Sequence, residues 1–142
     1  MTRVGRAAEA DAAAIAELLE VLGYPATDAQ VRARLERFEG VPGADVLVAE
    51  HDGEVVGVVG MSPTHLLGHD RPACRITALA VRAKHRRRGV ARALVDAVEE
   101  EARRQGCFRV EATCRPDRTG AHAFYADRGF EEWRYRFAKP LE

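Results

Sequence analysis

The stretch that decides the fold is residues 79–94, which read LAVRAKHRRRGVARAL. It is typical of an apolar strand, a short turn rich in arginine, one glycine and the first turns of an amphipathic helix. A glycine in such a turn lets a ligand approach the backbone closely, and the first turn of a helix offers N–H groups and a positive dipole. The stretch therefore predicts a binding site for a phosphate-bearing ligand.

On both sides of this stretch, strand and helix patterns alternate. Strands are predicted at residues 2–7, 46–49, 55–59, 76–81, 107–113 and 130–138. Helices are predicted at residues 11–22, 28–39, 90–105 and 119–128. Thr27 begins a capping-box pattern, Asp52-Gly53 predicts a hairpin, and residues 62–72 read as a loop. The strand–helix–strand order over 76–113 predicts a parallel pair, so we expect one α/β (α+β) domain over residues 1–142 with a mixed sheet.

Composition narrows the function classes. The chain has 142 residues and no net charge, so we expect neither a nucleic-acid nor a membrane partner. Its three cysteines (Cys74, Cys107 and Cys114) are odd in number and lack Cys-x-x-Cys spacing, which favours a reducing cytoplasm over a disulfide framework. The histidines are scattered, so no metal site is expected, and neither a signal peptide nor an apolar span of ~20 residues is seen. These features favour a cytoplasmic enzyme or binding domain.

Two motifs resemble the signatures of the GNAT N-acetyltransferase superfamily. Residues 86–91, RRRGVA, match the pattern Gln/Arg-x-x-Gly-x-Gly/Ala, with alanine in place of the second glycine. Residues 121–130, AHAFYADRGF, resemble the second signature, Ala-x-x-Phe-Tyr followed by Gly-Phe. The resemblance covers essentially the whole chain. It implies a mostly antiparallel central sheet with a splayed parallel pair, flanked by about four helices.

The resemblance implies acetyl-CoA as the cosubstrate. A bulge in strand 76–81 would free backbone groups to pair with the pantetheine arm, and one N–H would polarise the acetyl carbonyl. A basic run by itself is typical of a solvated face or a nucleic-acid patch, but the glycine at the required offset favours the cofactor. The residues implied to bind acetyl-CoA are Leu79, Ala80, Val81, Arg86, Arg87, Arg88, Gly89, Val90, Ala91, Arg92 and Arg118.

Tyr125 is the candidate general acid. In the family, the tyrosine at this position returns a proton to the leaving thiolate, whose conjugate acid has a pKa near ~8.5. A tyrosine packed in the core is the alternative interpretation. His122 and Arg118 recur in a subgroup with Arg-x-x-Ala-His-x-Phe-Tyr and are expected to be structural or to face the cofactor.

The general base is where the sequence departs from the family. Many relatives carry a glutamate just before the position of Leu79, whereas this chain has Arg75, Thr77 and Ala78 there. An alkylammonium substrate must lose a proton before it attacks. Glu111, on the neighbouring strand, is the first candidate base. A relay through water remains open, as do three other side chains, those of His65, His69 and Asp70.

The acceptor is the least determined part of the prediction. The resemblance places its site at residues 23–25 and 62–72, and a C-terminal Arg136-x-Phe-x-Lys139 resembles acetyltransferases of the aminoalkylphosphonate and aminoglycoside type. A small primary amine is therefore the leading hypothesis. Acetylation of protein N-termini or lysines and a non-catalytic acyl-CoA sensor are the alternatives, and a homodimer through the C-terminal strand is one expectation.

Overall fold

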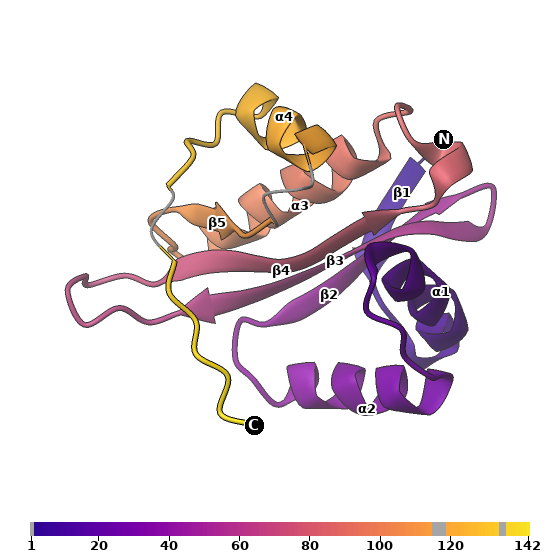
Figure 1. The fold of residues 1–142 in the computed structure, drawn as a ribbon, viewed down its shortest axis with the longest axis horizontal. Coiled ribbons are helices and arrows are strands. Elements are labelled where there is room, and N and C mark those ends of the chain that lie inside the picture. The colour runs from indigo at the N-terminus through magenta and orange to yellow at the C-terminus, as the bar shows by residue number, and fades with distance from the viewer. Residues whose placement is uncertain (1, 115–118, 134–135) are drawn as a thin grey trace. The chain divides into compact units, whose positions relative to one another are not determined.

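A computed structural model describes residues 2–114, 119–133 and 136–142 of the chain (Figure 1). The chain divides into two compact units, Met1–Ala112 and Thr113–Glu142. The first unit contains the whole described sheet and three α-helices, and the second contains one helix. A single domain over residues 1–142 stays a prediction.

The sheet of the first unit has five strands in the order β1-β2-β3-β4-β5 (Figure 1). The strands are β1 (Thr2–Arg6), β2 (Asp45–His51), β3 (Glu54–Thr64), β4 (Ala73–Val81) and β5 (Val110–Ala112). Neighbours among β1 to β4 are antiparallel, and β4 and β5 are parallel. The turn between β2 and β3 has positive φ at both Asp52 (51°) and Gly53 (79°), which suits a tight hairpin. The predicted hairpin and the predicted parallel pair are both confirmed.

Helices cover both faces of this sheet. A Cβ on Gly60 would point at Phe38 of α2 (Asp28–Glu39), whereas a Cβ on Gly57 would meet Val90 and Leu94 of α3 (Val90–Arg104). Because Gly57 and Gly60 are three residues apart on one strand, they face opposite sides. Helix α2 therefore lies on one face and α3 on the other. Helix α1 (Ala12–Leu22) packs with α2, since its Ile15 and Leu18 share a buried cluster with Val31 of α2.

Local signals in the sequence account for the helix boundaries. Thr27 Oγ1 accepts a hydrogen bond from Gln30 N at 3.1 Å, and Gln30 Oε1 accepts one from Thr27 N at 2.9 Å, which is the predicted capping box. Helix α1 ends at Gly23, which has a φ of 94°. In α3 the buried side chains recur at helical spacing and form one apolar face; they are Val90, Leu94, Val95, Val98 and Ala102.

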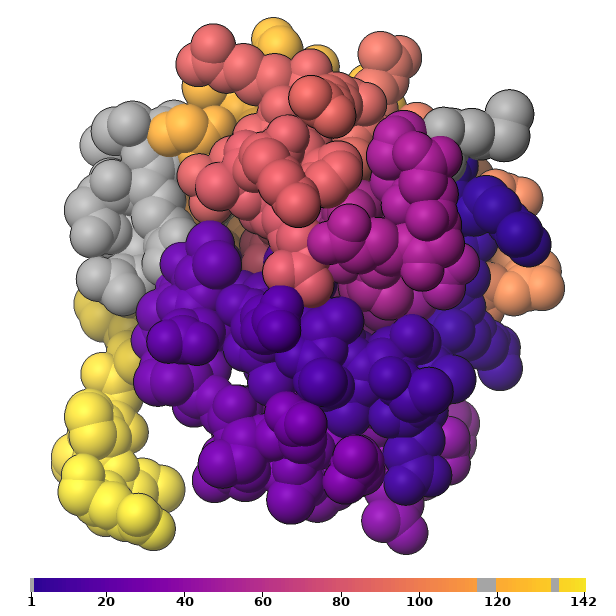
Figure 2. All heavy atoms as spheres, turned by 90° about the vertical axis from the view of Figure 1, so that its right-hand side faces the viewer, coloured from indigo at the N-terminus to yellow at the C-terminus, as the bar shows by residue number. Residues whose placement is uncertain are grey.

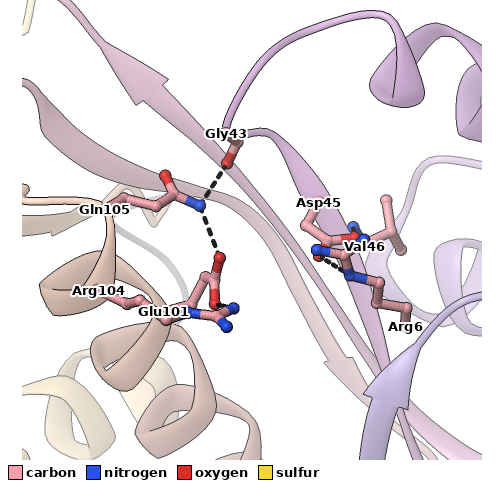
Figure 3. Close-up of polar contacts among 7 residues, drawn as sticks. All are labelled: Arg6, Gly43, Asp45, Val46, Glu101, Arg104 and Gln105. Carbon is pink, nitrogen blue, oxygen red and sulfur yellow. Dashed lines mark hydrogen bonds and ion pairs between the residues drawn. The ribbon is translucent and has the colours of Figure 1, made fainter.

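The C-terminal end of α3 is tied to the loop that precedes β2. Gln105 Nε2 donates hydrogen bonds to the carbonyl of Gly43 at 3.2 Å and to Glu101 Oε1 at 2.9 Å (Figure 3). A Cβ on Gly43 would lie 2.8 Å from Gln105 Oε1, so the contact depends on a glycine there. Glu101 also pairs with Arg104. These bonds fix the end of α3 that lies away from the arginine-rich turn.

Three strand predictions needed correction. Residues 62–64, predicted as loop, continue β3, because Pro63 lies opposite Cys74 in the register with β4. The strand predicted at 107–113 is limited to Val110–Ala112. The strand predicted at 130–138 is wrong for the described residues of that segment, 130–133 and 136–138, which have no regular secondary structure. A strand forms only where a neighbour supplies backbone hydrogen bonds, and local sequence does not specify that neighbour.

The second unit is built around α4 (Thr119–Asp127). The ring of Tyr125 packs edge-on against Phe124 and Phe130, with ring centroids 5.3 and 5.2 Å away. Gly129, with a φ of 87°, lets the chain turn back after the helix, so Phe130 N donates to the carbonyl of Tyr125 at 3.0 Å. The described part of the chain has no helix long and apolar enough to span a bilayer. All three cysteines are free thiols.

Candidate functional site

Strand β4 has a free edge beyond its short pairing with β5. β5 pairs with β4 only from Cys74 to Ile76, so within the described first unit residues 77–81 pair with β3 alone. The register between β3 and β4 shifts here: Gly60 lies opposite Ala78, and Met61 lies opposite Ile76. Thr77 is therefore the extra residue of a β-bulge. A bulge in β4, which the family resemblance implied, is thus present two residues before Leu79.

The arginine-rich turn follows this edge directly. A short 3-10 helix, η2 (Ala83–His85), leads into Arg87 and Gly89, both of which have positive φ, 62° and 80°. Gly89 is the N-cap of α3, and its carbonyl accepts the first intrahelical hydrogen bond from Ala93 N at 3.0 Å. A Cβ on Gly89 would meet nothing within 4 Å, so open space surrounds this position. The N–H groups of the first turn of α3 thus lie beside an accessible glycine, the geometry that binds phosphate.

Positive charge surrounds this glycine. Five exposed cations lie within one turn and the start of one helix; they are Lys84, Arg86, Arg87, Arg88 and Arg92. None of them forms an ion pair with a described residue. Their charge is therefore available to an anion, and the positive end of the α3 dipole adds to it.

Arg82 anchors the turn to two other elements. Its Nε donates to the carbonyl of Val55 at 2.9 Å, its backbone N to that of Val56 at 2.8 Å, and its guanidinium to Glu17 Oε2 at 2.8 Å. Figure 2 looks onto this end of the first unit, where segment 82–89 lies at the surface beside the β2–β3 hairpin and α1. The turn is thus held in place by β3 and α1.

His85 lies beneath the turn and is only 8% exposed. Its ring packs edge-on against His51 with ring centroids 5.7 Å apart, and its buried Nδ1 has no hydrogen-bond partner within the described part of the chain. Burial and the charges of Arg88 and Lys84 lower the pKa of His85 below its ordinary value, while Glu54 opposes them. Folding therefore disfavours the protonated form of the His85 imidazole.

Glu111, the first candidate base, sits between two arginines. Its Oε1 accepts from Arg75 at 3.0 Å, and its Oε2 accepts from Arg109 at 2.8 and 2.7 Å. Burial alone would raise the pKa of Glu111, but the bonds and charges of Arg75 and Arg109 outweigh it and hold the pKa below its ordinary value. Both oxygens are engaged, so Glu111 is a weak proton acceptor. Its role as a base stays a prediction that this geometry disfavours.

The other candidate bases lie in the loop between β3 and β4. The ring of His69 stacks on Phe108 with centroids 4.3 Å apart. His65 lines a cavity of about 470 Å³ together with Asp45, Pro63 and Glu101. That cavity lies where β2 and α3 meet at Asp45 and Glu101, the opposite end of the sheet from the turn. Within the described residues, no group of three or more side chains is arranged to hold a metal ion.

Tyr125 is half-buried in the second unit. Burial and the neighbouring Cys114 thiol raise the pKa of Tyr125 to about 12, so its phenol stays protonated at neutral pH. His122 Nδ1 lies 3.8 Å from Glu132 Oε1. Arg118 lies outside the described residues. The catalytic role of Tyr125 stays a prediction.

Sequence reasoning missed the roles of Arg82, His85 and Arg75. Arg82 and His85 are the two residues of segment 82–88 that the fold buries substantially, and within a run of basic residues nothing marked them out. Arg75 was noted only because a glutamate is absent near it. Its pairing with Glu111 depends on the register of β4 and β5, which local sequence does not set.

Comparison with known proteins agrees with this geometry. The model of the acetyltransferase (GNAT) family matches residues 12–130. An aminoalkylphosphonate N-acetyltransferase of Salmonella typhimurium is 31% identical over 70% of this chain and 65% of its own length. The chain spans 40–65% of the length of the first curated relatives it matches.

Two solved structures share the fold. A transcriptional regulator from Bacillus halodurans has a TM-score of 0.88 at 23% identity, covering 99% of this chain and 100% of its own. An aminoglycoside N-acetyltransferase solved in complex with CoA has a TM-score of 0.86 at 22% identity, and the match covers 99% of this chain and 95% of that chain. The order of the strands, the bulged β4, the glycine-capped α3 and the family match all agree, and the chain belongs to the GNAT acetyltransferase family.

Proposed function

We propose that this protein transfers the acetyl group of acetyl-CoA to the primary amine of a small molecule, by direct attack in a ternary complex. The observation that carries the proposal is the junction of β4 and α3. The open edge at 77–81 is followed, after the turn at 82–89, by a glycine-capped helix start, and the cations around it form no ion pair with a described residue. A long ligand with a polar arm and a pyrophosphate matches that order of features.

The residues of this junction would divide the work of holding acetyl-CoA. The edge formed by Leu79, Ala80 and Val81 would pair with the pantetheine arm. The N–H groups at Val90, Ala91 and Arg92 would bind the pyrophosphate, which approaches closely because Gly89 has no side chain. The guanidinium groups of segment 86–88 would add charge-assisted hydrogen bonds.

The chemistry requires three proton movements. The ammonium of the acceptor first loses one proton, and its nitrogen attacks the acetyl carbonyl carbon to form a tetrahedral intermediate. As the C–S bond of this intermediate breaks, the nitrogen loses its second proton and the leaving thiolate takes up one, so the relaying acid ends neutral. We assign the protonation of the thiolate to the phenol of Tyr125, which is protonated at neutral pH. For the first transfer we favour a water relay, because Glu111 has its oxygens bound to Arg75 and Arg109.

A small amine is favoured as acceptor by the aminoalkylphosphonate N-acetyltransferase among the relatives. The three free thiols support a reducing compartment, for which we propose the cytoplasm. Exposed apolar side chains in the C-terminal segment, Trp133 and Phe137, support a homodimer. Sedimentation at several concentrations measures that association.

Two measurements on the purified protein test the proposal. Calorimetric titration with acetyl-CoA should give saturable binding, and the ligand should raise the melting temperature by mass action. A panel of primary amines, assayed for thiol release, should then identify at least one acceptor. Absence of binding at millimolar acetyl-CoA would reject the cofactor site.

A non-catalytic acyl-CoA sensor is the second candidate. It is favoured by one observation, the lack of a carboxylate on β4 beside the bulge, where Arg75, Thr77 and Ala78 stand. This candidate predicts tight binding of acetyl-CoA with no thiol release for any amine, peptide N-terminus or lysine in the panel.

A further inference from the structure

Three polar side chains form a row across the sheet just before the bulge of β4. Ser62 of β3 lies opposite Arg75 of β4, which lies opposite Glu111 of β5. Ser62 is two residues beyond Gly60, so it shares the face of the sheet that α2 covers, and its cross-strand partner Arg75 shares that face. The row therefore lies on the face opposite α3.

Arg75 has binding capacity left over in this row. It uses one guanidinium nitrogen on Glu111 Oε1, at 3.0 Å, whereas Arg109 takes Glu111 Oε2 with two nitrogens. Its side chain is 42% exposed, and its buried Nε–H has no hydrogen-bond partner among the residues that the structure describes. An unsatisfied buried donor is costly, and a guanidinium with free N–H groups matches carboxylate and phosphonate oxygens.

Charge favours an anion at this place. Arg75, Arg109 and Glu111 together carry one more positive than negative charge. Glu111 binds Arg75 by a single hydrogen bond, which leaves the Nε–H of Arg75 without a partner among the described residues. A second carboxylate or a phosphonate would complete the pairing of the two arginines with anionic groups.

The row is close to the part of β4 that would hold the acetyl group. Only Ile76 separates Arg75 from the bulge at Thr77, a distance of roughly 7 Å at ~3.3 Å per residue. Thr77 lies on the same face of the sheet as Arg75, because a Cβ on Gly60, which would point to the face that α2 covers, would come within 3.0 Å of Thr77 Oγ1. A short molecule could thus place its amine beside the free edge and another group at the guanidinium.

We propose that Arg75 binds an anionic group, a carboxylate or a phosphonate, on the acceptor amine and so determines which amines are acetylated. Glu111 acts as a positioning residue for Arg75. The inference rests on the proposed acetyl transfer, and it predicts a substrate that carries both an amine and an anionic group a few bonds apart.

Three amines with the same two-carbon spacer test the inference: 2-aminoethylphosphonate, β-alanine and ethanolamine. The wild-type protein should show a kcat/KM for at least one of the anionic amines about 10-fold or more above that for ethanolamine. Arg75→Gln should reduce this preference by about 10- to 100-fold, the effect of one charge-assisted hydrogen bond, and change kcat/KM for ethanolamine by less than about 3-fold. Arg75→Lys should restore part of the preference.

Arg103→Gln is the matched control, since Arg103 is exposed in the last turn of α3 and lies away from the row. Arg103→Gln should leave kcat/KM unchanged for all three amines. Thermal melts of each variant report whether the fold is intact. Equal values for the three amines in the wild type, or an equal loss for all three in Arg75→Gln, would overturn the inference while leaving the proposed transfer intact.

A direct binding measurement separates this inference from the proposed function. If no amine releases thiol from acetyl-CoA, the proposed transfer fails. Titration of 2-aminoethylphosphonate and β-alanine into the CoA-saturated protein then decides the role of Arg75. Binding that Arg75→Gln weakens about 10-fold and Arg103→Gln does not would support an anion site. Absent binding, or binding that both variants retain, would reject it.

Discussion

Replacing Gly89 by alanine separates the cofactor site from the stability of the fold. Gly89 has a φ of 80°, and a Cβ there would meet no atom within 4 Å. In the unliganded protein the substitution should therefore lower the free energy of unfolding by about 1–2 kcal/mol, which is the strain of a left-handed backbone at a residue with a Cβ. For a chain of this size that corresponds to a fall in melting temperature of roughly 3–8 °C.

The cost to cofactor binding should be larger. In the proposed complex the pyrophosphate occupies the open space beside Gly89, so the new methyl group would lie against the phosphate oxygens. We expect acetyl-CoA affinity to fall about 10-fold or more in Gly89→Ala. Gly89→Glu, which adds a negative charge at the same point, should abolish binding.

Gly53 provides a matched control. It has nearly the same conformation, with a φ of 79°, and a Cβ there also meets nothing within 4 Å, but it lies in the β2–β3 hairpin. Because a Cβ at Gly53 causes the same backbone strain as one at Gly89, Gly53→Ala should lower the melting temperature by the same amount. Its affinity for acetyl-CoA, measured by calorimetry, should stay within about 2-fold of wild type. Equal acetyl-CoA affinities for the two alanine variants would refute the phosphate-binding role of Gly89.

Three further predictions concern the acid, the packing of α3 and the titration of His85. Tyr125→Phe should lower kcat about 100-fold or more and leave the Kd for acetyl-CoA within about 3-fold, and an unchanged kcat in the thiol-release assay would remove the acid role. Gly57→Ala would place a Cβ 2.9 Å from Val90 Cγ1 and 3.0 Å from Leu94 Cδ1, so urea unfolding should report a loss of about 1–3 kcal/mol, and full stability would argue against the close approach of α3. The pKa of His85 is lowered by folding, so the unfolded chain takes up a proton first as pH falls below 6.5, and stability should decrease from pH 7.5 to 5.5. His85→Phe should weaken that decrease, and an equally steep pH dependence of urea unfolding in the variant would contradict the assignment.

Features that depend on neighbours in sequence were predictable. The capping box at Thr27 and Gln30 and the hairpin at Asp52-Gly53 are made by side chains and backbone within four residues. Their bonds form wherever the local conformation allows, so the pattern itself identifies them. The glycine at the start of α3 belongs to the same class, because its positive φ is a local requirement.

Features that depend on strand register were not predictable from local patterns. Arg75 and Glu111 are 36 residues apart, and only the parallel pairing of β4 with β5 brings them together. The same pairing adds the guanidinium of Arg75 to that of Arg109 beside Glu111, and the two hold the pKa of Glu111 below its ordinary value. The strand expected at 130–138 was wrong for its described residues, since alternation of side chains does not supply a partner strand.

The sequence by itself indicated the family, the acetyl donor that the family uses, and the turn that we propose binds phosphate. These follow from residues 79–94 and 121–130, where a strand end, a glycine and a helix start are contiguous. The tertiary structure alone decided which basic side chains have no carboxylate partner among the described residues. Lys84, Arg86, Arg87, Arg88 and Arg92 have no ion pair with a described residue, whereas Arg82 is bound to β3 and α1. A charge contributes to binding only when no carboxylate within the fold already neutralises it, and that depends on contacts between residues far apart in the chain.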